Sequence, residues 1–130
     1  MATRPRPEKG QIASPRRGEI YWVRFDPTVG HEIQKTRPAV IIQNDVSNRY
    51  SPVTLVAAVS SRFSDPPFPR EVMIEPGESG LPKLSAVIVN QIRSVDRQRL
   101  AKKLGELSGQ SMRRVDQAIK ISLGLTEPLR

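Results

Sequence analysis

Alternating and continuous apolar stretches in the first half of the chain predict three short strands. Apolar side chains occupy both faces over residues 20–25, and Asp26-Pro27 ends this first strand. A polar loop that includes Gly30 and His31 follows it. Residues 37–45 and 53–61 carry continuous apolar runs, which indicate strands buried on both faces. Residues 46–52 are rich in Asn, Ser and Pro and are typical of a turn.

The second half predicts further strands and then one helix. The proline-rich segment 64–70 is excluded from helices and central strands because proline lacks an N–H. We expect strands over 70–76 and 85–95, joined by a glycine-containing connection over 77–84. Residues 96–107 are ambiguous between a helical turn and a strand, and we favour a turn over 96–100 and a strand near 103–107. Helical spacing then predicts a C-terminal helix of about four turns, capped by Ser108 and ended by Gly124, with an apolar stripe of Met112, Val115, Ala118, Ile119 and Leu123.

Five or six short strands and one terminal helix indicate a mainly β fold, a strongly bent antiparallel sheet or barrel with the helix packed on it. The length of 130 residues fits one domain, which we place at residues 17–125, with tails over 1–16 and 126–130. Residues 1–17 carry a net charge of +4, half of the total of +8, and three prolines. We expect this basic tail to be disordered, and a solubilising tail, a misassigned start and an RNA-grasping arm all remain open as its role.

Composition also bears on location. No apolar stretch approaches the length of a membrane span or a signal peptide, so we expect no membrane association. The chain has no cysteine, and therefore no disulfide framework and no thiolate. A reducing cytoplasm is the simplest expectation.

The side chains that are present restrict the chemistry. The chain has one histidine, and its carboxylates are scattered rather than clustered for Mg²⁺ or Ca²⁺. Neither a Gly-x-Gly-x-x-Gly motif nor a phosphate loop occurs. We therefore expect any catalysis to need no metal or cofactor and to use arginine, hydroxyl and amide groups, with one carboxylate at most.

Cleavage of RNA fits such a set of groups, because the substrate supplies its own nucleophile. The ribose 2′-hydroxyl can attack the adjacent phosphorus, and DNA, which lacks this group, would be spared. The enzyme must hold the phosphate in line and offset the charge that develops on its oxygens. A bidentate, permanently charged guanidinium suits this task, and a nearby hydroxyl can donate to the same phosphate.

Arg37 and Ser60 are the candidates for these two groups. Both lie at ends of predicted buried strands, beside polar loops, and Pro38 restricts the backbone next to Arg37. If the second and third strands pair antiparallel, the two residues lie close together. Spacing alone favours a surface salt bridge or edge-strand protection for Arg37, and it favours even more strongly a Ser60 hydroxyl that only ends its strand.

Four stretches, which occur in the family's order and at its spacing, carry a family resemblance. They are RGEIYWVRFDP, the Gly-x-Glu-x-x-Lys-x-Arg-Pro pattern from Gly30 to Pro38, the QND that ends the second strand, and NQIRSVD. The region from Arg16 to Leu125 resembles the MazF/PemK family of toxins from toxin–antitoxin systems. The resemblance implies an SH3-like barrel of the CcdB/PemK/MazF type, a homodimer and a cognate MazE-like antitoxin. It also implies a metal-independent, sequence-specific endoribonuclease that leaves 2′,3′-cyclic phosphate and 5′-hydroxyl ends on single-stranded RNA.

The resemblance also implies roles for individual residues. Arg37 takes the position of the family's catalytic arginine, and Ser60 that of its catalytic hydroxyl, which is usually threonine. Neighbouring Ser61 is an alternative to Ser60. An acidic, partly disordered antitoxin tail would wrap the dimer near Arg37. RNA contacts are expected from His31, Glu32, Lys35, Thr36, Ser61 and Gln91.

Two other functions compete with this interpretation. The same small barrel occurs in CcdB-like inhibitors that bind DNA gyrase without cleaving anything, and fold alone does not settle function. The second competing function is that of a barrel that binds RNA without cutting it. Arg37 and its loop motif argue against the gyrase inhibitor, which has no need of an arginine that faces phosphate.

Overall fold

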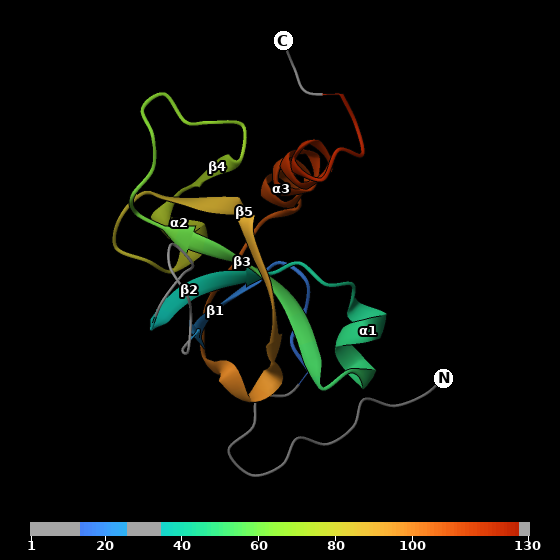
Figure 1. The fold of residues 1–130 in the computed structure, drawn as a ribbon. Coiled ribbons are helices and arrows are strands. Elements are labelled where there is room, and N and C mark those ends of the chain that lie inside the picture. The colour runs from blue at the N-terminus through green and yellow to red at the C-terminus, as the bar shows by residue number, and fades with distance from the viewer. Residues whose placement is uncertain (1–13, 26–34, 128–130) are drawn as a thin grey trace.

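A computed structural model describes residues 14–25 and 35–127. Within them, six strands form one antiparallel sheet in the order β4-β5-β3-β2-β1-β6 (Figure 1). The strands are β1 (Glu19–Arg24), β2 (Thr36–Ile41), β3 (Val53–Ser60), β4 (Glu71–Ile74), β5 (Ser85–Asp96) and β6 (Leu100–Glu106). The helices are α1 (Asp45–Tyr50), α2 (Pro76–Ser79), the 3₁₀ helix η1 (Arg97–Arg99) and α3 (Gly109–Ser122).

The predicted mainly β fold with a C-terminal helix is confirmed, but three local predictions were wrong. Residues 45–50, expected as strand end and turn, form α1, because the Asn44 side chain accepts a hydrogen bond from the Ser47 N–H and caps the helix. The 77–84 connection overlaps the short helix α2. The last strand begins at Leu100 rather than near Lys103, directly after η1.

Each face of the bent sheet carries its own apolar core. Ile20 and Val40 are paired across β1 and β2 and belong to the core that also includes Val115 of α3. The next pair along, Tyr21 and Ala39, points to the opposite face and belongs to the second core. The sheet is therefore buried on both sides near its centre, as the continuous apolar runs predicted.

The C-terminal helix α3 begins and ends where the sequence predicts. The Ser108 hydroxyl accepts a hydrogen bond from the Ser111 N–H at the start, and Gly124 has a φ of +73° after the end. Glu78 of α2 adds a second cap, accepting from the Ser108 N–H at 2.7 Å and from the Ser111 hydroxyl at 2.8 Å. Burial raises the pKa of the Glu78 carboxyl, but these hydrogen bonds together lower it below its usual value. A carboxylate thus joins α2 to α3.

The sheet is only loosely a barrel, because no ladder between β4 and β6 closes it among the described residues. Instead, the backbone around α2 packs against β6 at two glycines. A Cβ on Gly80, which has a φ of +73°, would overlap the backbone of Leu104, and a Cβ on Gly105 would overlap the backbone of Glu78 and Ser79. This close backbone contact takes the place of strand pairing between the two edges of the sheet.

The described chain begins inside the region expected to be a tail. Ser14 and Pro15 are buried, and the Arg17 guanidinium forms an ion pair with Asp116 of α3 and donates to the Ile42 carbonyl. Residues 1–13 and 128–130, to which most of the two predicted tails belong, lie outside the described residues. None of the described helices is long and apolar enough to cross a membrane.

Candidate active site

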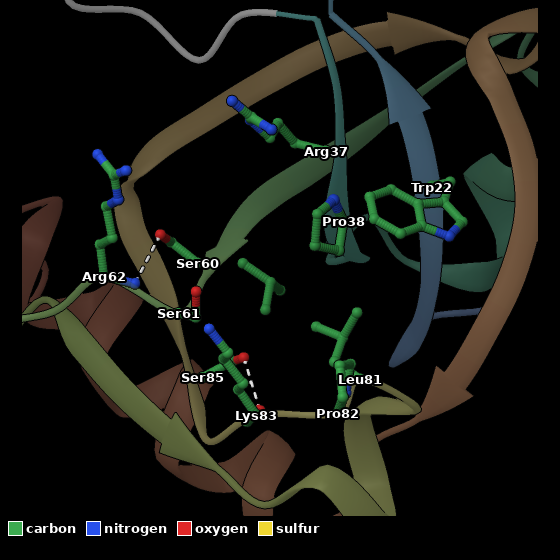
Figure 2. Close-up of a pocket in the computed structure, with 11 residues that line it drawn as sticks. Trp22, Arg37, Pro38, Ser60, Ser61, Arg62, Leu81, Pro82, Lys83 and Ser85 are labelled. Carbon is green, nitrogen blue, oxygen red and sulfur yellow. Dashed lines mark hydrogen bonds between the residues drawn. The ribbon is translucent and has the colours of Figure 1, made fainter.

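Arg37 and Ser60 lie at the same end of the sheet. Strands β2 and β3 pair antiparallel, as expected, with Ala39 opposite Ala58 and Val40 opposite Ala57. Because β2 begins where β3 ends, this register brings Arg37 beside Ser60. Both side chains line a pocket of about 550 Å³ (Figure 2).

The Arg37 side chain is exposed at the start of a well-held strand. Its backbone pairs with Val23 of β1, and buried Pro38 follows it. The guanidinium forms no hydrogen bond or ion pair with any residue that the structure describes. β2 also lies between β3 and β1, so edge-strand protection is excluded as its role. These observations leave the guanidinium available to bind an anion.

Ser60 is half-buried at the last position of β3. Its backbone pairs with Ala86 of β5. Its hydroxyl oxygen accepts a hydrogen bond from the Arg62 N–H at 3.0 Å, drawn as a dashed line in Figure 2. A hydroxyl that accepts in this way keeps its own proton to donate into the pocket. Ser61 lines the same pocket from the following residue and is exposed.

The pocket contains residues that the sequence alone did not assign to a site. Arg62 and Lys83 enter it from two loops, and neither side chain has an ionic or hydrogen-bonding partner among the described residues. No acidic residue occurs in its described lining, so with Arg37 the pocket presents three unpaired cations. The remaining wall is largely apolar and is built from Trp22, Pro38, Val59, Leu81 and Pro82. Such a combination suits a ligand with phosphate groups and a planar base.

The other predicted RNA-contacting residues lie elsewhere or outside the described chain. His31 and Glu32 belong to residues 26–34, which are not described. Lys35 has a φ of +61°, and its carbonyl accepts from the Phe25 N–H at 2.8 Å, so it closes the base of the β1–β2 connection. Thr36 lines a separate pocket with Arg24, Asp96, Gln98 and Arg99.

Gln91 is half-buried in an irregular part of β5. Ala57 and Ala58, which are neighbours on β3, pair with Ile92 and Ile88, so residues 89–91 have no partner on β3. Gln91 lies in this bulged segment and does not line the Arg37 pocket. β-Bulges re-aim side chains and are frequent beside functional sites.

No group of three or more His, Cys, Asp or Glu side chains suited to hold a metal ion occurs among residues 14–25 and 35–127.

Comparison with known proteins gives one consistent result. The family model of the PemK-like, MazF-like toxins of type II toxin–antitoxin systems matches residues 16–123. An endoribonuclease MazF from Staphylococcus saprophyticus is 44% identical over 110 residues, which are 85% of this chain and 92% of the relative.

Solved structures agree with this match. MazF from Deinococcus radiodurans has a TM-score of 0.74 at 27% identity, covering 87% of this chain and 99% of that one. A MazE–MazF structure from the same organism has a TM-score of 0.71 at 26% identity, covering 88% and 100%. The resemblance in the sequence motifs is thereby confirmed, and the chain belongs to the PemK-like, MazF-like toxin family of type II toxin–antitoxin systems.

Proposed function

We propose that this chain is a toxin that acts as a metal-independent, sequence-specific endoribonuclease on single-stranded RNA. The observation that carries the proposal is the pocket that the Arg37 guanidinium and the Ser60 hydroxyl both line, with two further cations and no acidic residue in its described lining. The 44% identity to an endoribonuclease MazF supports the same activity.

The reaction that this pocket suits is transesterification within the RNA. The 2′-hydroxyl loses its proton and its oxygen forms a bond to the adjacent phosphorus as the bond to the 5′-oxygen breaks. The 5′-oxygen takes up a proton, which yields a 2′,3′-cyclic phosphate and a 5′-hydroxyl. Arg37 would stabilise the charge on the non-bridging oxygens, because a guanidinium stays protonated and is poorly suited to act as a base. Ser60 would donate its hydroxyl proton in a hydrogen bond to the phosphate or to the leaving 5′-oxygen.

The substrate would extend beyond the reacting phosphate. Trp22 and the neighbouring prolines offer a face on which a base can stack, while Arg62 and Lys83 would contact flanking phosphates. Ser61 would contact the RNA from the pocket rim. We keep His31, Glu32, Lys35, Thr36 and Gln91 as proposed RNA contacts.

We also propose a homodimer, which is supported by an exposed apolar surface. Val46 and Tyr50 of α1 are 65% and 53% exposed, and Val53 and Leu55 at the start of β3 are each 38% exposed. The helix contacts this strand, so the four side chains come from adjoining elements (Figure 1). An apolar surface of this kind suits a two-fold interface, in which the same patch meets its copy.

A cognate antitoxin is the second proposed partner. The Deinococcus radiodurans relative has been solved as a MazE–MazF structure. An acidic segment of a MazE-like antitoxin would find three unpaired cations in the pocket and would block RNA there. We place this pair in the cytoplasm, where its RNA target is found.

The CcdB-like gyrase inhibitor is disfavoured. The family match and the named relative both point to the nuclease branch of this fold, and gyrase binding would leave the presence of Arg37 and Ser60 in one pocket unexplained. A barrel that binds RNA without cleaving it is distinguished only by assay.

The test uses a long unstructured RNA, a matched DNA and excess chelator. A kinase that labels only free 5′-hydroxyls reports the chemistry of the new ends. Cleavage at a recurring short sequence, with labelled ends and intact DNA, is expected. Intact RNA in the presence of folded protein would contradict the proposal, and cleavage that stops with chelator would contradict the metal-free mechanism.

A further inference from the structure

We propose that Glu71 is a positioning residue, which shapes the β3–β4 loop (residues 61–70) so that the Arg62 N–H holds the Ser60 hydroxyl in its reactive orientation. The inference rests on the proposed function, because it deepens the role assigned to Ser60. Glu71 itself lies outside the described lining of the pocket.

The Glu71 carboxylate joins the two limbs of this loop. It accepts hydrogen bonds from the Phe68 N–H at 2.8 Å and from the Ser64 N–H at 3.1 Å. The loop contains prolines at 66, 67 and 69, which have no N–H to donate. With so few donors, the loop depends on this carboxylate for its shape.

Glu71 is well placed to act as such an anchor. It is the first residue of β4, its backbone pairs with Ile88 of β5, and its N–H donates to the Phe68 carbonyl at 2.8 Å. The Phe68 N–H is the main cause that lowers the pKa of the Glu71 carboxyl; burial opposes it, and Ser64 and Arg70 add to the lowering. The group is therefore ionised at neutral pH and can accept both hydrogen bonds.

The loop in turn contacts the hydroxyl of Ser60. The Arg62 N–H donates to the Ser60 oxygen at 3.0 Å (Figure 2). Ser60 and Met73 both pair with Ala86 of β5, and Glu71 lies two residues before Met73, so Glu71 and Ser60 share one face of the sheet. A continuous path thus runs from the carboxylate through the loop backbone to the hydroxyl.

This path matters because position 60 is serine. A serine hydroxyl rotates among three staggered positions, whereas the methyl group of threonine restricts that rotation. Here the Arg62 N–H supplies the restriction that a methyl would otherwise give. Loss of the Glu71 carboxylate should therefore harm a serine enzyme and spare a threonine enzyme.

The experiment compares wild type, Glu71→Gln, Ser60→Thr and the double variant under steady-state conditions. We expect Glu71→Gln to lower kcat about tenfold with KM changed less than about twofold, since misplacement affects the chemical step more than binding. In the Ser60→Thr background the same change should alter kcat by less than about twofold. Glu75→Gln is the matched control, because Glu75 is exposed and its side chain has no hydrogen bond in the described structure.

Equal losses of kcat in the serine and threonine backgrounds would overturn the inference, as would an effect confined to KM. Amide hydrogen exchange adds a readout that needs no cleavage. The Arg62 amide should exchange faster in Glu71→Gln while amides of the core strands do not change, and unchanged exchange at Arg62 would also overturn the inference. A wild-type protein that fails to cleave RNA would instead contradict the proposed function, so the two failures are distinguishable.

Discussion

Arg37 and Ser60 lie on neighbouring antiparallel strands, at the start of one and the end of the other, and line one pocket. The strand residues behind them, Ala39 and Ala58, are fully buried. Each candidate side chain is therefore attached to rigid backbone while its polar end lines the pocket. Such an arrangement suits a site that must meet a phosphate in one geometry.

Arg37→Ala should abolish cleavage while leaving the fold intact. Removing one charge-stabilising donor costs about 100-fold or more in kcat, and the Arg37 side chain makes no hydrogen bond or ion pair with the described residues that its loss would disturb. Rates of cleavage and thermal unfolding of the same preparation check this. A large fall in melting temperature would return Arg37 to a structural role.

Substitutions at Ser60 separate its hydroxyl from its size. Ser60→Ala should lower kcat strongly, and Ser60→Thr should retain activity within about threefold because the hydroxyl remains. Ser61→Ala tests the alternative hydroxyl in the same assay. If Ser61→Ala were the inactive variant and Ser60→Ala the active one, the assignment of the two serines would be reversed.

Arg62→Gln and Lys83→Gln should weaken RNA binding without altering the chemistry. Each removes one cation that is proposed to contact phosphate, so KM should rise. The negative slope of log affinity against log salt should become shallower by about 0.7 for single-stranded RNA. Binding of a non-cleavable RNA at several salt concentrations measures this. Arg113→Gln, on an exposed position of α3, is the control and should leave the slope unchanged.

Glu78→Gln should destabilise the protein at neutral pH by about 1 kcal/mol, as expected for loss of a helix cap. The pKa of Glu78 is lower in the folded protein than its ordinary value of 4.5. The stabilisation by this carboxylate is therefore fully present above pH 4.5 and is lost as the pH falls through the folded pKa. Urea unfolding at pH 7 and in acid should show the gap between wild type and variant closing in acid. An equal gap at both pH values would mean that the carboxylate charge has no part in the cap.

Gly80→Ala and Gly105→Ala should each cost about 2 kcal/mol or more, because the new Cβ would overlap backbone atoms that cannot rotate away. Gly77→Ala is the matched control, since a Cβ added at Gly77 would have no described atom within 4 Å beyond its own helix and chain neighbours. Chemical unfolding measures all three variants. Comparable stability of all three would show that the packing of α2 on β6 adapts easily.

The fold could largely be predicted because strand and helix patterns are local. Alternation and apolar runs placed the strands, and Ser108 and Gly124 placed both ends of α3. Helix α1 was missed because the segment is short and its Asn44 cap is a weak signal when it stands alone, while further support comes from β3, outside the helix. Buried Asn48 accepts a hydrogen bond from the Thr54 hydroxyl at 2.7 Å, a contact that no local pattern of this short segment reveals.

The candidate site, too, could be predicted from the sequence only in part. Arg37 was singled out because Pro38 and a buried strand follow it, the family resemblance suggested its catalytic role, and the observed strand pairing places it near Ser60. Arg62 and Lys83 are ordinary loop cations in the sequence and reach the pocket only through the folding of two separate loops. Glu71 is equally inconspicuous, since its partners are backbone N–H groups rather than side chains.

The measurement that tests the central claim most directly uses an RNA oligonucleotide with one cleavage site. A single 2′-deoxy substitution is placed at the nucleotide whose 2′-oxygen would attack, and the oligonucleotide is compared with its all-ribose parent. We predict that cleavage is lost while binding changes by no more than a few fold, because the missing hydroxyl is the nucleophile. Continued cleavage of the substituted RNA would mean that water attacks the phosphorus, and the mechanism built on Arg37 and Ser60 would be contradicted.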